Sequence, residues 1–355
     1  MRKSILFTTA LTLPLFGQAP EVKTAEQVYK NITELKGTPA DQLVPTMQFI
    51  SVSLGVECVT CHVGGKPEAD DKRTKKTARE MIAMTLMINK NAFHGQTQVT
   101  CFSCHRGAER PVAMPPVLES DAAPARPTPP AAPATASTPP TADSILEKYV
   151  TALGGPDAMK KVTSRVGKGV ITTSGKDTPI EVFTKAPNKR VTISHNANGD
   201  SFTAFDGTAG WMGNTGRPAR DMSPAESMAS GLDSEFYLGL RLKEIFTQLR
   251  SGRPDKIGDV AVISLNGMRQ GQPPVRFFFD ANSGLLLRTV RYAETPVGRM
   301  PTQIDYTDYR EVDGVKTPFR WTLSRPNGRF TIQLSEVKAN APLDDSKFAK
   351  PAETK

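Results

Sequence analysis

The sequence has few of the residues from which active sites are usually built. Its 355 residues include only four cysteines and four histidines. The region from residue 143 to 350 holds a single histidine, His195, with no cysteine and no G-x-S-x-G motif, so it offers no catalytic constellation that we can identify. The chain also lacks a concentrated basic tract, and we therefore do not expect nucleic acid as a partner, although the formal net charge is +9.

The N-terminus lacks an apolar run long enough to cross a membrane comfortably. Two basic residues precede the run from Ile5 to Phe16, and the small residues Gly17 and Ala19 follow it. This is the layout of a secretory signal peptide, which we place at residues 1–19. No cysteine lies near the expected cleavage site, which argues against a lipid anchor of the lipoprotein type. We expect a periplasmic or otherwise exported protein, in which only an uncleaved N-terminus would contact a membrane.

All four cysteines belong to two copies of one five-residue motif, C-x-x-C-H. The two copies consist of Cys58, Cys61 and His62, and of Cys101, Cys104 and His105. This motif is the attachment signature of c-type haem, in which the two thiols form thioether links to the porphyrin and the adjacent imidazole binds the iron. The two copies predict two covalently bound haem c groups.

Two other interpretations use the same cysteines. In an exported protein they could form two disulfides, and two C-x-x-C pairs could also form an all-thiolate zinc site. Neither interpretation explains why a histidine follows the second cysteine in both copies, in a chain with four histidines. We therefore favour haem.

Methionines on two predicted helices are candidates for the second axial ligand of each iron. Residues 22–118 have the pattern of a helical haem domain, and an apolar stripe in it ends at Gly55, three residues before the first motif. The stripe consists of Leu43, Met47, Ile50 and Leu54. A methionine in such a stripe is usually part of a core, but this stripe leads to an iron that needs a sixth ligand. We therefore favour Met47 as that ligand.

The second predicted helix runs from Lys72 to about Ala92, between the two motifs. Basic residues are frequent in its first turns, where we expect contact with haem propionates, with a partner or only with solvent. Met81, Met84 and Ile88 share one face of this helix. Either methionine could bind the second haem, and their spacing does not decide between them.

In order and spacing these motifs resemble the tetrahaem cytochrome c subunit of photosynthetic reaction centres. The matching residues are Tyr29-Lys30-Asn31, Thr46-Met47, Cys58 to His62, Ala78 to Met81 with Met84, Ile88-Asn89, and Val99 to Gly107. The resemblance covers residues 28–110 and corresponds to one half of that subunit, which is built from two diheme units. The second unit has no counterpart in this chain.

The resemblance also implies distal iron ligands. In that family, a methionine on the helix before each of the first two motifs binds the iron. By position, Met47 would serve the haem of the first motif and Met81 the haem of the second, which favours Met81 over Met84. His94 falls near a family histidine that reaches a haem of the other half. Its role here stays open between an exposed remnant, a ligand to a haem in another subunit, and a competitor for one of these irons.

The predicted coordination indicates electron transfer. An iron bound by histidine on one face and methionine on the other has no vacant position for a substrate. We therefore predict a carrier of electrons between extracytoplasmic redox proteins, and favour this role over that of an enzyme. The positive charge would favour acidic redox partners or would only keep the surface solvated. The alternative function is a diheme peroxidase-type oxidoreductase, which would need a five-coordinate or easily opened haem.

The rest of the chain predicts a linker and a second domain. Residues 119–142 are rich in proline and alanine, which is typical of an extended linker, so we expect the domains to move relative to each other. Residues 143–350 begin with a helical segment and continue with ten strand-like runs separated by tight turns. A helix is expected from Glu235 to Leu249, over the concave face of a sheet. The predicted fold is a mainly α diheme domain followed by an α+β domain with a curved antiparallel sheet, or half-barrel.

The strand rhythm of the second domain weakly resembles periplasmic lipoprotein carrier and sorting proteins. The residues that carry this resemblance are Phe279-Asp280 to Leu287, and Tyr309 to Phe319. In those proteins a half-open barrel cradles acyl chains. The resemblance implies a hydrophobic ligand or lipid, or else a protein partner, in the second domain. It also leaves open that the chain is a lipid or lipoprotein carrier that bears haems.

Overall fold

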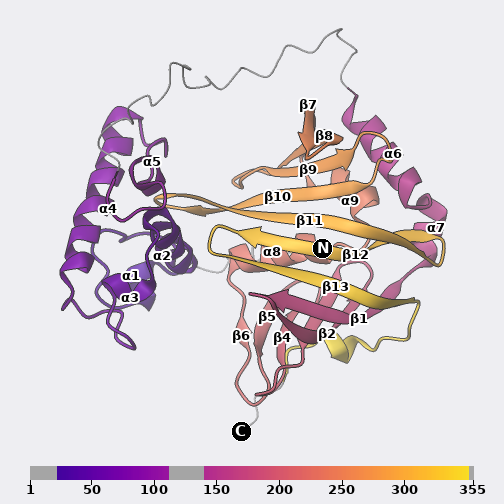
Figure 1. The fold of residues 1–355 in the computed structure, drawn as a ribbon, viewed down its shortest axis with the longest axis horizontal. Coiled ribbons are helices and arrows are strands. Elements are labelled where there is room, and N and C mark those ends of the chain that lie inside the picture. The colour runs from indigo at the N-terminus through magenta and orange to yellow at the C-terminus, as the bar shows by residue number, and fades with distance from the viewer. Residues whose placement is uncertain (1–21, 112–139, 352–355) are drawn as a thin grey trace, which may run out of the picture.

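The structure is a computed structural model that describes residues 22–111 and 140–351. The predicted signal peptide, residues 1–19, and nearly all of the predicted linker, residues 119–142, lie outside the described residues. The described chain forms a helical N-terminal part and a larger part built on one sheet (Figure 1).

The helical part contains two long helices and three short ones within residues 22–111. They are α1 (Ala25–Val28), α2 (Ala40–Leu54), α3 (Cys58–Cys61), α4 (Arg73–Ala92) and α5 (Cys101–His105). Both predicted long helices are confirmed by α2 and α4. Helix α2 ends at Gly55, whose φ of 67° is the left-handed conformation that glycine adopts readily at a helix C-terminus. Each long helix is followed in the chain by a short helix that carries a C-x-x-C-H motif.

The second part is a curved antiparallel sheet of 13 strands that does not close into a barrel. The strands are β1 (Ser164–Thr173), β2 (Lys176–Lys185), β3 (Lys189–Ser194), β4 (Ser201–Phe205), β5 (Gly210–Asn214), β6 (Arg220–Asp221), β7 (Gln248–Ile257), β8 (Val260–Met268), β9 (Val275–Asp280), β10 (Leu286–Thr295), β11 (Gly298–Val312), β12 (Val315–Arg325) and β13 (Gly328–Ala339). The chain runs from β1 in the middle to β6 at one edge, crosses to β7 at the other edge, and returns to pair β13 with β1.

Four α-helices and one short 3-10 helix accompany the sheet in residues 140–351. They are α6 (Ala142–Leu153), α7 (Pro156–Lys161), α8 (Pro224–Ser234), α9 (Leu238–Ile245) and the 3-10 helix Asp345–Phe348. Helices α8 and α9 make the crossing from one sheet edge to the other. The apolar face of α6 packs on the sheet, where the ring of Tyr149 lies 5.0 Å from that of Phe279. These contacts form the main core of the second part.

The predicted elements of the second part differ from the observed ones near both edges of the sheet. The predicted strands lie in β1 to β4 and β8 to β13, whereas β5, β6 and β7 were not predicted. The helix predicted from Glu235 to Leu249 is too long, because α9 ends at Ile245 and β7 starts at Gln248. Strand β7 contains Pro254 and several charged residues, which an edge strand tolerates but which hide the alternation of a half-buried strand.

The β10–β11 hairpin reaches the helical part (Figure 1). Hairpin turns usually lie in solvent, yet Val297 in this turn is 0% exposed and Met300 is 4% exposed. Both side chains belong to one apolar cluster with Phe49 of α2 and Ile82 of α4. A Cβ at Gly298 would overlap the Phe49 ring, so the hairpin backbone itself lies against α2. The two parts are therefore in direct contact through this hairpin.

None of the helices in residues 22–111 and 140–351 combines the length and the apolar character that crossing a membrane would require.

Candidate functional site

Each C-x-x-C-H motif lies on a one-turn helix that gathers its reactive groups. In α5 the residues Cys101, Cys104 and His105 have the i, i+3, i+4 spacing that places side chains on one helix face. Cys58 and Cys61 have the same i, i+3 relation in α3. All four thiols are free in the structure. Both motifs thus present two thiols side by side, as attachment to two vinyl groups of one porphyrin requires.

Both motif histidines are held by a hydrogen bond between ring nitrogen Nδ1 and a main-chain carbonyl oxygen. Nδ1 of His62 lies 2.8 Å from the carbonyl oxygen of Pro67, and Nδ1 of His105 lies 3.0 Å from that of Ala108. A carbonyl oxygen can only accept, so Nδ1 must carry the proton in both rings. Nε2 then has a free lone pair, which is the arrangement found in metal-binding histidines. The donor set of each motif therefore fits a haem iron.

The loop after the first motif is held by basic residues of α4. Lys75, which is 8% exposed, donates to the carbonyls of Pro67 and Ala69, both at 2.9 Å. Pro67 thus accepts from Lys75 and from His62 at once. Nζ of Lys75 and Nη1 of Arg79 also contact the carboxylate of Asp70, at 3.1 and 3.0 Å. Lys75 and Arg79 therefore stabilise the loop that orients His62, so the expectation of solvent contact alone is wrong for these two residues. The expected contact of the basic residues with propionates or with a partner stays a prediction.

Asp70→Asn should destabilise the helical part in a pH-dependent way. Hydrogen bonds from Arg79, Asn31 and Lys75 hold the pKa of Asp70 well below its usual range. A lowered pKa in the folded state contributes stability above the pKa of the unfolded chain, about 4, and this contribution is lost as the pH falls. We expect a lower thermal midpoint of the variant at pH 7 and converging midpoints toward pH 2. A constant difference between the two proteins across this pH range would contradict the ion-pair explanation.

The two motifs are held together through the end of α2. The backbone N–H of Gly107 donates to the carbonyl of Ser53 at 2.8 Å. A Cβ at Gly55 would overlap the carbonyl oxygen of Gly107, so glycine is required for this approach as well as for its left-handed backbone. The segment that leaves the second motif therefore packs on the turn that enters the first.

The candidate methionines differ in their surroundings. Met47 is half-buried on α2 and packs against the apolar cluster that contains Phe49, Ile82 and Val297. On α4, Met81 is 38% exposed and Met84 is 40% exposed. Exposure therefore does not separate Met81 from Met84.

The cysteine thiols are not gathered into one metal site in the structure. In residues 22–111 and 140–351, no three side chains among histidine, cysteine, aspartate and glutamate lie close enough to share a metal ion. An all-thiolate zinc site would need all four cysteines together. Burial raises the pKa of the Cys61 thiol and that of the Cys101 thiol, so both are protonated at neutral pH in this state.

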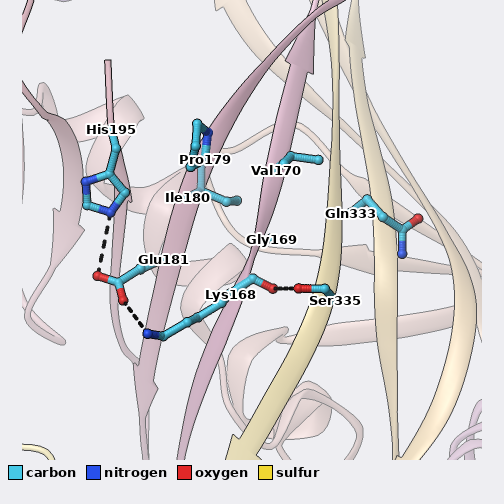
Figure 2. Close-up of a pocket in the computed structure, with 9 residues that line it drawn as sticks. All are labelled: Lys168, Gly169, Val170, Pro179, Ile180, Glu181, His195, Gln333 and Ser335. Atoms are coloured by element: carbon cyan, nitrogen blue, oxygen red, sulfur yellow. Dashed lines mark hydrogen bonds and ion pairs between the residues drawn. The ribbon is translucent and has the colours of Figure 1, made fainter. Parts of the chain in front are cut away.

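The other two histidines lie apart from the motifs in sequence and in environment. His94 is exposed just after α4 and has a positive φ of 53°. His195 lines a shallow pocket of ≈ 440 Å³ on the sheet (Figure 2). Its Nδ1 lies 3.1 Å from Asp200 and its Nε2 lies 3.6 Å from Glu181, which also pairs with Lys168. His195 therefore lies among surface carboxylates, with its Nδ1 within hydrogen-bond distance of Asp200.

A larger groove follows the concave face of the sheet. It has a volume of ≈ 1290 Å³ and is lined by strands from both halves of the sheet and by α8. Residues of α2, among them Val44 and Gln48, form part of its wall. Aromatic and aliphatic side chains alternate in it with arginines. Its size and lining are those of a small-molecule site.

Comparison with known proteins confirms the resemblance of the N-terminal part. A family model described as the photosynthetic reaction centre cytochrome C subunit matches residues 9–139. The photosynthetic reaction center cytochrome c subunit from Thermochromatium tepidum is 36% identical over 87 residues, which are 23% of this chain and 22% of that protein. The subunit from Roseobacter denitrificans is 31% identical over 115 residues, 30% of each chain. The matches span less than a third of either relative.

Solved structures similar to the chain are more distant in sequence. A DUF1329 family protein from Desulfovibrio piger is 11% identical, with a TM-score of 0.44, and the match covers 58% of this chain and 96% of that one. A LolA superfamily protein from Nitrosomonas europaea is 14% identical, with a TM-score of 0.42, and the match covers 59% of this chain and 98% of that one.

Proposed function

We propose that the protein is an exported diheme c-type cytochrome that carries electrons between extracytoplasmic redox proteins. The observation that carries this proposal is the fixed tautomer and ring orientation of the two motif histidines. Their Nδ1 atoms donate to the carbonyls of Pro67 and Ala108. Both rings therefore offer Nε2 to an iron beside two free thiols. The match of residues 9–139 to a cytochrome c family supports the same function. We assign residues 22–118 to the haem domain and residues 143–350 to the sheet domain.

The distal ligands follow from the same arrangement. We assign Met47 to the haem of the first motif and Met81 to the haem of the second. Helix α3 packs directly against α4, and α2 packs directly against α5. A porphyrin whose iron is bound on both faces separates the elements that carry its two ligands, so directly packed helices are poor candidates for one ligand pair. This packing supports α2 with α3, and α4 with α5.

The residues around the irons would orient the iron ligands and limit the access of water. Bound haem would supply reversible one-electron chemistry. Ligation of the iron by the methionine sulfur would raise its reduction potential. The carbonyls of Pro67 and Ala108 keep the imidazoles oriented, and the half-buried Met47 limits access of water to its side of the site. Sixth ligands from the chain leave no position for oxygen or peroxide, which favours electron transfer over catalysis.

Alanine variants of the methionines test this assignment. Met47→Ala and Met81→Ala should each remove about half of the weak methionine-to-iron absorption band of the oxidised protein, and each should lower the reduction potential of one haem. Met84→Ala is the matched control, because Met84 lies on the same helix with nearly the same exposure as Met81. Loss of the band in Met84→Ala alone would reassign the second ligand. High-spin iron with rapid peroxide turnover in the unaltered protein would instead support the peroxidase-type alternative.

We also propose that the sheet domain binds a hydrophobic ligand in its groove. The groove volume of ≈ 1290 Å³ and its aromatic and aliphatic walls support this role. Binding of an uncharged long-chain ester to the whole protein tests it, and failure of the ester to bind would favour a protein partner for this domain.

A further inference from the structure

The groove contains three arginines, Arg190, Arg291 and Arg325, around one aspartate, Asp233. Nη1 of Arg291 lies 2.6 Å from Oδ1 of Asp233, and its side chain is 12% exposed. Nη1 of Arg190 donates to the main-chain carbonyl of Asp233 at 3.1 Å. Nε of Arg325 donates to the hydroxyl of Thr302 at 3.3 Å. Only Arg291 forms an ion pair with a side chain here, among the described residues.

Strand register brings Arg325 next to Arg291. Thr302 on β11 is the direct partner of Arg291 on β10, and the same threonine accepts from Arg325. Burial lowers the pKa of Arg325, and the nearby charge of Arg291 lowers it further. These two guanidinium groups thus repel each other across one threonine.

Arg165 adds a fourth positive charge at the other end of the groove, because it pairs with Ala339 at the end of β13, whereas Arg325 pairs with Gly328 at its start. Thr184 pairs with Arg165 on one side and with Arg190 on the other, so the two arginines lie on one face of the sheet, two strands apart. The Arg165 guanidinium lies over the ring of Phe236, 4.5 Å from its centre, and its Nε has no hydrogen-bond partner in the described chain. Burial lowers the pKa of Arg165 to about 10.

The other carboxylates of the groove do not balance this charge. Glu226, Glu235, Glu294 and Asp221 line it and pair with Arg220, Arg241, Arg299 and Lys350 at 2.8, 3.0, 2.8 and 2.6 Å. Asp41 lies in the first turn of α2, where it faces the positive helix end. Asp233 is therefore left as the carboxylate for Arg190, Arg291 and Arg325, and Arg165 has none within residues 22–111 and 140–351.

Apolar surface continues from this cluster along the groove. Trp321 lies beneath Arg190, whose guanidinium carbon is 5.3 Å from the ring centre. The groove wall beyond it includes Ile304, Leu323, Ile332 and Leu334. An acyl chain could lie along this wall while its polar end meets the arginines.

We propose that the groove binds an amphiphile with an anionic headgroup, a carboxylate or phosphate, held by Arg190 and Arg325 near Asp233, with its tail along β11 to β13. This inference rests on the proposed hydrophobic-ligand function of the sheet domain and names the chemical class of the ligand. Guanidinium groups bind both headgroups through paired hydrogen bonds. Each such contact would replace a repulsion that the empty groove contains.

Binding of a fluorescent long-chain fatty acid and of its methyl ester to the full-length haem-loaded protein tests the proposal. We expect the acid to bind at least about tenfold more tightly than the ester, because one charge-assisted hydrogen bond is worth about that factor. The variant Arg325→Gln should lose this advantage for the acid and bind the ester unchanged. Arg329→Gln, an exposed position next to Phe330 of the groove wall, is the control and should bind both probes normally.

The variant Arg325→Gln is expected to fold. Arg325 forms no ion pair with a carboxylate in the described residues, so neutralising it should leave the melting temperature unchanged or higher. Arg190→Gln gives the same comparison if Arg325→Gln is impaired. Equal binding of acid and ester by the unaltered protein would overturn the anionic headgroup while keeping a hydrophobic ligand, and binding of neither probe would overturn both. Displacement of the acid by millimolar inorganic phosphate would overturn the amphiphile in favour of a free anion.

Discussion

Replacing Val297 by aspartate is expected to uncouple the sheet from the helical part. Val297 is 0% exposed at the tip of the β10–β11 hairpin, in one cluster with Phe49 and Met300. An unpaired carboxylate at such a position costs on the order of 3–5 kcal/mol, because the charge loses its water without gaining a partner. The hairpin tip should lose its contact with α2 and α4 and move into solvent, since strands β10 and β11 can stay paired during this movement.

Two probes can follow the two parts of the molecule separately during denaturation. Haem absorbance reports on the helical part, and the two tryptophans, Trp211 and Trp321, both lie in the sheet. We expect the two transitions to coincide in the unaltered protein and to separate in Val297→Asp. Asn327→Asp is the matched control, because it adds a charge to the exposed turn between β12 and β13. Coincident transitions in both variants would show that the contact between the hairpin tip and the helical part does not couple the unfolding of the two parts.

Replacing Cys101 and Cys104 by serine is expected to yield a protein with one haem instead of two. The serine hydroxyls cannot form thioether links, so porphyrin at the second motif would not survive denaturation. Intact mass and haem staining of the denatured protein should show the loss of one group. The first motif should keep its haem, because its thiols lie on a separate helix, α3.

The reciprocal variant completes this experiment. Cys58→Ser with Cys61→Ser should also leave one covalent haem, and combining all four changes should leave none. A colourless protein from a host that matures cytochromes, or a protein containing zinc and no porphyrin, would contradict the proposed function. Partial attachment through a single remaining thiol is avoided because both thiols of a motif are replaced together.

The helical part could be predicted closely because its signals are local. The apolar stripe that contains Met47 repeats at the period of a helix, and Gly55 supplies the left-handed residue that ends it. The motif spacing likewise places thiols and imidazole on one helix face without any tertiary information. Strand β7 lacks such a signal, since Pro254 and its charged neighbours are allowed only by its place at the sheet edge.

Contacts between residues that are distant in the chain could not be predicted from local sequence patterns. Lys75 appeared as one of several basic residues in a helix, and only the fold shows that it shares the Pro67 carbonyl with His62. Val297 looked like an ordinary hairpin residue, because nothing local indicates that a turn will be buried in another part of the chain. The arginine cluster draws on β3, β10 and β12, whose neighbourhood depends on the pairing of β1 with β13.

Helix α2 belongs to both sites of the molecule. Residues from Ala40 to Gln48 wall the groove, and Met47 on the same helix is the proposed iron ligand. An occupant that binds the oxidised and the reduced protein with unequal affinity must, by thermodynamic reciprocity, shift the midpoint potential by the same free energy. A titration of the midpoint potential against occupant concentration would then measure the coupling free energy between binding in the groove and reduction of the haem.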